Sequence, residues 1–149
     1  MTLSLFLHVL SIVVWVGGMF FAYMALRPVA ASVLEPPQRL TLWVGVFDKF
    51  FPWVWASVAL ILLTGLYMLH LLGNAAPLYA YAMLVLGVVM MLIFGHVYFS
   101  PYKKLKRAVT AQDWKAGGAA LAMIRQLIGI NLSIGLITIA VVFVGRMLG

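Results

Sequence analysis

One apolar run near the start, Leu3–Leu26, most constrains what this chain can fold into. It extends over about 24 residues without a single Asp, Glu, Lys or Arg. A helix rises about 1.5 Å per residue, so this run reaches roughly 36 Å and can cross a hydrocarbon core of about 30 Å. Backbone amides must be satisfied internally in lipid, which predicts a helix. The run therefore indicates a membrane-spanning helix.

Three further apolar runs of similar length follow, at Phe50–Leu72, Leu78–Phe99 and Leu127–Leu148. Over the whole chain 66% of residues are hydrophobic and 9% are charged. A soluble domain is nearer half apolar and a quarter charged. We therefore predict an all-α integral membrane protein with a single transmembrane domain over residues 1–149. Short connections make sequential helices antiparallel, which favours an up-down four-helix bundle.

Basic residues fall almost entirely on one side of the predicted membrane. Nine of the ten Lys and Arg residues lie between the first and second runs or between the third and fourth. Positively charged connections stay in the cytoplasm, which predicts a bacterial inner-membrane, multi-pass protein with both termini in the periplasm. The same rule explains the net charge of +7 without a nucleic acid partner. The cluster Lys103–Arg107 fits this role, with anionic lipid headgroups as its alternative contact.

Both basic connections contain helical signals. The first predicts an interfacial helix, followed by a kink or restart at Pro52, because apolar residues recur at helical spacing after Pro36. Those residues are Leu40, Trp43, Val44, Phe47 and Phe50. In the second, Thr110–Asp113 is compatible with a capping-box-like helix start, and Trp114 with an interface anchor. We therefore expect short interfacial helices in the cytoplasmic connections.

Three histidines lie within the apolar runs, where polar side chains are rare and tend to mark function. By helical rise, His8 lies roughly 8 Å below the outer end of its helix, and His70 lies roughly 3–5 Å below the outer end of the next helix. His96 belongs to the cytoplasmic side. Neutral imidazole is a good metal ligand, so we predict that His8 and His70 share one metal ion.

Heme b is one cofactor that suits two histidines at this depth. It requires two axial imidazoles across a slot walled by glycine and aromatic side chains. The first two runs offer Trp15, Gly18 and Gly65 for such walls. Heme propionates also require donors at the outer face, where Arg146 is the one basic side chain.

Copper(I) is the other cofactor, because soft ligands bind it well. Met68, Met83 and Met147 lie in the same outer half as His8 and His70. Methionine is also common filler in apolar helices, so packing remains the simpler interpretation of these three residues. The chain contains no cysteine, which excludes thiolate metal sites and thioether-linked heme.

The first run also resembles a known family, through His8-Val-Leu-Ser-Ile-Val-Val-Trp15-Val-Gly-Gly18 and the Arg27-Pro28 that ends it. It is similar to the bacterial copper-resistance protein D (CopD) membrane family and, more distantly, to HemJ-type protoporphyrinogen oxidases. Weaker similarity continues through Phe51-Pro52-Trp53, Thr64-Gly65-Leu66-Tyr67 and Tyr102–Arg107.

The two resemblances imply different functions. The CopD resemblance implies copper handling across the inner membrane. The HemJ resemblance implies heme b with His8 as one axial ligand and His70 or Met83 as the second. The lysine that HemJ proteins use early in the third span is absent here, and Met83 is its nearest match. The resemblance therefore does not extend to the oxidase activity.

Our main hypothesis from the sequence is an inner-membrane heme b protein, resembling a cytochrome b, with His8 and His70 as ligands. It would carry out electron transfer or redox chemistry near the periplasmic face, with a quinone or a periplasmic redox protein as partner. The alternative is a copper-binding or copper-transport protein of copper resistance. A third hypothesis is a structural membrane subunit without a cofactor. Membrane oxidoreductase activity and a homo-oligomeric state are both compatible with the sequence.

Overall fold

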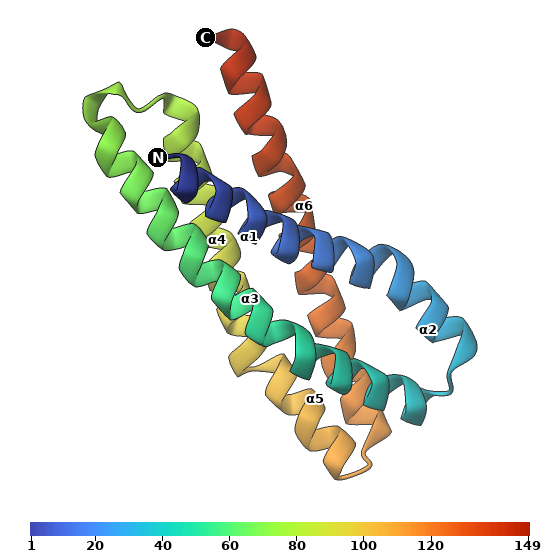
Figure 1. The fold of residues 1–149 in the computed structure, drawn as a ribbon. Coiled ribbons are helices and arrows are strands. Elements are labelled where there is room, and N and C mark those ends of the chain that lie inside the picture. The colour runs from blue at the N-terminus through green and yellow to red at the C-terminus, as the bar shows by residue number, and fades with distance from the viewer.

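The computed structural model describes residues 1–149, and every element in it is a helix (Figure 1). Four of its helical segments are long and apolar enough to cross a membrane. The elements in chain order are α1 (Thr2–Phe21), the π-helical segment η1 (Ala22–Leu26), α2 (Arg27–Val33), α3 (Pro36–Leu72), the 3-10 turn η2 (Gly73–Ala75), α4 (Leu78–Phe99), α5 (Pro101–Thr110) and α6 (Trp114–Leu148).

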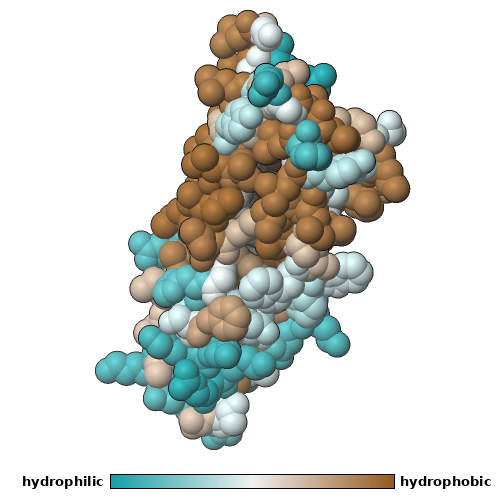
Figure 2. Space-filling model, turned by 90° about the vertical axis from the view of Figure 1, so that its left-hand side faces the viewer, coloured by the Kyte–Doolittle hydropathy of each residue, from teal (hydrophilic) through white to brown (hydrophobic).

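The long helices alternate in direction along the chain. In Figure 1, α1 and α3 run side by side in opposite directions. The closest helix pairs are α1 with α3 and α4 with α6, and contacts of α1 with α6 and of α3 with α4 join the two pairs. This arrangement confirms the predicted all-α membrane bundle. Figure 2 shows hydrophobic residues over the middle and one end of the molecule, with hydrophilic residues gathered at the other end.

We call the end that carries α2, α5 and the start of α6 the basic end, and the opposite end the terminal end. Aromatic side chains fill the core at the basic end. Phe47 and Phe51 stack with ring centroids 4.8 Å apart, and Tyr102 meets Phe51 edge-on at 4.8 Å. Phe94 packs edge-on against Phe51 at 5.3 Å. These rings join three segments, α3, α4 and α5, into one cluster.

The first connection differs from its prediction. No separate interfacial helix restarts at Pro52, because α3 runs through that residue as one helix of 37 residues. Proline removes one backbone hydrogen bond from a helix. Phe47, Phe51 and Val54 are buried on both sides of Pro52, and their packing holds the helix together despite this loss. The predicted interfacial segment is therefore the first part of α3.

The second connection also corrects a detail. Thr110 is the last residue of α5 and does not start a helix. Gln112 adopts a positive φ of 56°, which turns the chain sharply. Asp113 then caps α6, because its side chain accepts a hydrogen bond from the Ala116 amide at 3.2 Å. α6 continues from there into the predicted fourth span.

Candidate metal centre

His8 is buried where α1 packs against α3, with 9% of its surface exposed. Its Nδ1 atom lies 2.9 Å from Oγ1 of Thr64, a buried residue of α3. The two residues are 56 positions apart in the sequence, so the contact depends on the antiparallel packing of the two helices. It is a buried side-chain hydrogen bond between two membrane-spanning helices.

The hydrogen bonds of Thr64 indicate how the imidazole is protonated. A threonine hydroxyl has one hydrogen to donate. Thr64 donates it to the carbonyl of Leu60, one helical turn earlier. With its hydrogen on the Leu60 carbonyl, the Thr64 oxygen can accept from His8 in the tautomer that carries the proton on Nδ1. Nε2 is left with its lone pair, which is the form of histidine that binds a metal ion.

Gly65 lets the imidazole approach the backbone of α3. A Cβ atom at this position would lie 3.4 Å from His8 Cε1 and 3.9 Å from Nδ1, so the ring edge occupies the space of a side chain. Contacts of 3.4 Å are at the close end of van der Waals separation. Any larger residue than alanine would therefore push the ring away from Thr64.

Two more buried hydroxyl groups lie on the same two helices as His8 and Thr64. Ser11 and Ser57 are also buried in helices α1 and α3, and Ser11 donates to the carbonyl of Leu7 at 2.8 Å. No three His, Cys, Asp or Glu side chains gather anywhere in the molecule. No ready-made cluster of such metal ligands therefore surrounds His8.

The structure distributes the other predicted ligands widely. His70 is exposed on α3 and lies six residues beyond Thr64, a rise of roughly 9 Å. Met83 is half-buried on α4, and Arg146 is exposed near the end of α6. His96 is exposed in the last turn of α4, toward the basic end. None of these residues makes a hydrogen bond to His8, so their roles remain predictions.

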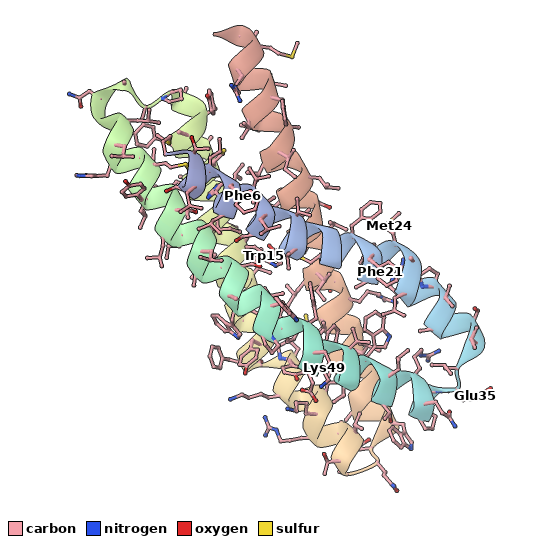
Figure 3. The ribbon with its side chains drawn as sticks, viewed as in Figure 1. Phe6, Trp15, Phe21, Met24, Glu35 and Lys49 are labelled. Carbon is pink, nitrogen blue, oxygen red and sulfur yellow. The ribbon has the colours of Figure 1, made fainter.

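Trp15 and Gly18 lie deeper along α1, two to three turns from His8. Trp15 is 2% exposed and meets Phe94 edge-on, with ring centroids 6.3 Å apart. Figure 3 labels its position on α1. Gly18 faces the ring of Phe50, which occupies the space that a Cβ atom would take. In this structure both residues therefore pack against neighbouring aromatic rings.

Thr64 is the site residue that sequence reasoning missed. The sequence does contain a sign of its role, because Thr64 is a polar residue eight positions before the end of its apolar run, at nearly the depth of His8.

A buried polar residue away from this site also links two helices. Asn131 on α6 donates from Nδ2 to the Met90 carbonyl at 3.3 Å. Its Oδ1 atom is buried without a partner. It ties α6 to α4 in the middle of the bundle.

A family model described as copper resistance protein D matches residues 44–144, about two thirds of the chain. The chain belongs to the copper resistance protein D family. The CopD match begins in α3, so it includes Thr64 and Gly65 but not His8. It gives no support to the similarity with HemJ-type oxidases. Neither a curated protein nor a solved structure matches the chain.

Membership in the CopD family and four apolar helices together identify a multi-pass membrane protein. The family match supports the copper hypothesis and gives no support to the heme hypothesis.

Proposed function

We propose that this CopD-family protein binds copper(I) at His8 and takes part in copper handling across the bacterial inner membrane. The observation that carries the proposal is the family match over residues 44–144. The hydrogen bond between His8 and Thr64 supports it, because a proton on Nδ1 would leave Nε2 of the buried imidazole free to bind a metal ion.

The chemistry of the nearby side chains favours the monovalent ion. Copper(I) accepts imidazole and thioether ligands and needs no carboxylate. Met68 lies one helical turn beyond Thr64 on α3 and is half-buried, and Met83 is half-buried on α4. We assign these two methionines as the soft ligands that complete the site with His8.

The distribution of charge supports an orientation for this site. Nine of the ten Lys and Arg residues lie at the basic end, and the rule of positive charge assigns that end to the cytoplasm. His8 then lies toward the periplasmic face, and both termini are periplasmic. In this orientation the protein receives copper from the periplasmic side.

The heme b hypothesis has weaker support. It requires a second axial ligand across a porphyrin from His8, and the predicted ligand His70 is exposed on the neighbouring helix. The family description names copper, whereas no comparison points to heme.

A Cu(I) titration tests the proposal. The detergent-purified protein is titrated anaerobically against bicinchoninate, a chromophoric Cu(I) competitor, as wild type, His8→Ala and His96→Ala. We expect one tight Cu(I) per chain in the wild type and in His96→Ala, and its loss in His8→Ala. Equal binding by all three proteins would overturn the assignment to His8. A Soret band that disappears in His8→Ala would favour heme b instead.

A further inference from the structure

A partly enclosed hollow lies at the basic end, far from His8. A cavity of about 460 Å³ opens between η1 and α2, the first part of α3, and the first part of α6. Figure 1 shows these segments surrounding the same corner of the molecule, and Figure 3 marks the nearby turn between α2 and α3 by Glu35. Nothing in the copper chemistry at His8 uses this cavity.

Four cations line the cavity, and no acidic residue does. They are Arg27, Arg39, Lys115 and Arg125. The single salt bridge of the chain joins Lys106 to Asp48 at 3.2 Å and involves none of them. Four like charges around one hollow repel each other, so the cavity attracts an anion and disfavours a copper cation.

Two of these arginines are held by neutral groups. Arg27 donates from Nε to the Tyr23 carbonyl at 3.1 Å, and its guanidinium lies 4.5 Å from the centroid of the Tyr23 ring. Arg39 donates to the Ala31 carbonyl at 3.4 Å. These contacts orient the guanidinium groups without neutralising them. Both retain further N–H donors for a bound anion.

The rest of the cavity wall is apolar. Leu40, Trp43, Phe47, Leu121 and Ile128 line it. A small inorganic anion would leave this wall without a partner, whereas an acyl chain would cover it. A second groove along α6 shares Tyr23, Ala122 and Arg125 with the cavity. The site therefore joins positive charge to an apolar wall, which is the combination that a phospholipid headgroup and acyl chain present.

We propose that this cavity binds the phosphate group of an anionic phospholipid from the leaflet at the basic end, with an acyl chain against the apolar wall. Arg39 and Arg125, on α3 and α6, contact the phosphate. Basic pockets between membrane helices on the cytoplasmic side are known sites for anionic headgroups. The bound lipid bridges α2, α3 and α6 and balances part of their positive charge.

Native mass spectrometry of the detergent-purified full chain tests this proposal. The probes are phosphatidylglycerol, phosphatidylcholine with the same acyl chains, and soluble glycerol phosphate. The double variant Arg39→Gln/Arg125→Gln is compared with Lys103→Gln/Lys104→Gln, which removes the same charge from exposed sites on α5. At about fivefold per basic group, we expect roughly thirtyfold weaker phosphatidylglycerol binding in the arginine variant only.

A second variant blocks the cavity without removing charge. A Cβ atom at Gly118 meets nothing within 4 Å, so Gly118→Trp fills the hollow from α6 without a clash in the protein. Gly95→Trp on α4, which also meets open space, is its control. We expect Gly118→Trp to lose selective binding of phosphatidylglycerol while Gly95→Trp retains it.

Three results would overturn the proposal. The first is equal binding of phosphatidylglycerol and phosphatidylcholine by the wild type. The second is equal loss in the arginine and lysine variants. The third is glycerol phosphate binding as tightly as phosphatidylglycerol, which would make the cavity a site for a soluble phosphate ester. Copper binding at His8 is a separate measurement, so neither proposal depends on the other.

Discussion

The two ends of this bundle are built differently. At the basic end, Phe47, Tyr102 and Leu105 are at most 4% exposed, and aromatic rings from three segments interlock. At the terminal end, no residue in 65–89 or 136–149 is buried. Lipid is as apolar as a leucine side chain, so helices in a membrane gain little by hiding such residues from it. The basic end therefore supplies most of the packing between helices.

The proposed copper site lies at the boundary between these two regions. His8 and Thr64 are the last buried pair of α1 and α3 before the packing becomes loose. A site at such a boundary has tightly packed residues on the side of the basic end and loosely packed residues on the side of the terminal end. Its hydrogen bond can fix the imidazole while methionines from the looser region reach the ion.

The largest expected effect comes from the aromatic cluster. Phe47→Ala removes a ring that is 1% exposed and contacts Trp43, Phe51 and Tyr102. We expect a loss of roughly 3–5 kcal/mol in the free energy of unfolding, because such a substitution leaves a cavity. Denaturation in mixed micelles measures it. Phe143→Ala, at a ring 63% exposed near the terminal end, is the control and should change stability by less than about 0.5 kcal/mol.

Equal destabilisation by Phe47→Ala and Phe143→Ala would show that packing is uniform along the bundle. That result would remove the contrast between the two ends.

At the boundary, Thr64→Val separates copper affinity from stability. Valine has nearly the shape of threonine but cannot accept the proton of His8 Nδ1. Loss of such a partner typically lowers metal affinity 10–100-fold, so we expect a decrease of that size in Cu(I) affinity. The free energy of unfolding should fall by only about 0.6 kcal/mol, as for other hydrogen bonds between membrane helices.

Ser57→Ala is the control for Thr64→Val, because it removes another buried hydroxyl from α3, about two helical turns before Thr64. An unchanged Cu(I) affinity in Thr64→Val would contradict the proposed orientation of the imidazole.

A smaller effect is expected at the polar edge of the aromatic cluster. Tyr102 donates a hydrogen bond to Oδ1 of Asp48, which links α5 to α3. Tyr102→Phe keeps the ring and removes this bond, and we expect a loss of about 1 kcal/mol in the free energy of unfolding. Tyr98→Phe, within the same cluster, is the matched control. An equal or larger loss in Tyr98→Phe would mean that losing a hydroxyl from this cluster, and not the bond to Asp48, decides the result.

The smallest effect belongs to the ion pair beside that bond. The side chains of Lys106 and Asp48 are 47% and 44% exposed, so solvent screens their attraction. Lys106→Gln should cost less than about 1 kcal/mol, and added salt should erase the difference from wild type. Unfolding measured at low and at high salt provides the comparison. A salt-independent loss would point to the contact of Lys106 with the Tyr102 ring instead.

The sequence predicts the helices well because their length is set by the membrane. An uncharged run of about 24 residues has few alternatives to a spanning helix, and the basic residues show which connections share a side. Helix boundaries inside the connections are harder to predict from the sequence. Thr110 and Asp113 both suit a cap, and the turn at Gln112 decides between them. The continuity of α3 through Pro52 depends on buried neighbours that no local pattern reveals.

The candidate site shows a similar limit. Counting residues from the helix ends gives the depth of a side chain, and on that basis His70 and His8 are close. Depth does not give the direction in which a side chain points. At 3.6 residues per turn, His70 and Thr64 point roughly 120° apart on α3, and the packing of α1 selects the face with Thr64. The level of His8 was therefore predictable, but its partner was not.

The π-helical segment Ala22–Leu26 changes the direction in which the later side chains of the first membrane-crossing helix point around its axis. A π-turn accommodates one extra residue, so everything after it is rotated by about 100° relative to a continuous α-helix. His8 lies before this segment and Arg27 after it. The two residues can therefore face different parts of the bundle although one unbroken helical rod carries both. Deleting a single residue here would remove the π-turn and leave the directions of both Arg27 and His8 unchanged, whereas a continuous α-helix of the full sequence would turn Arg27 by about 100°.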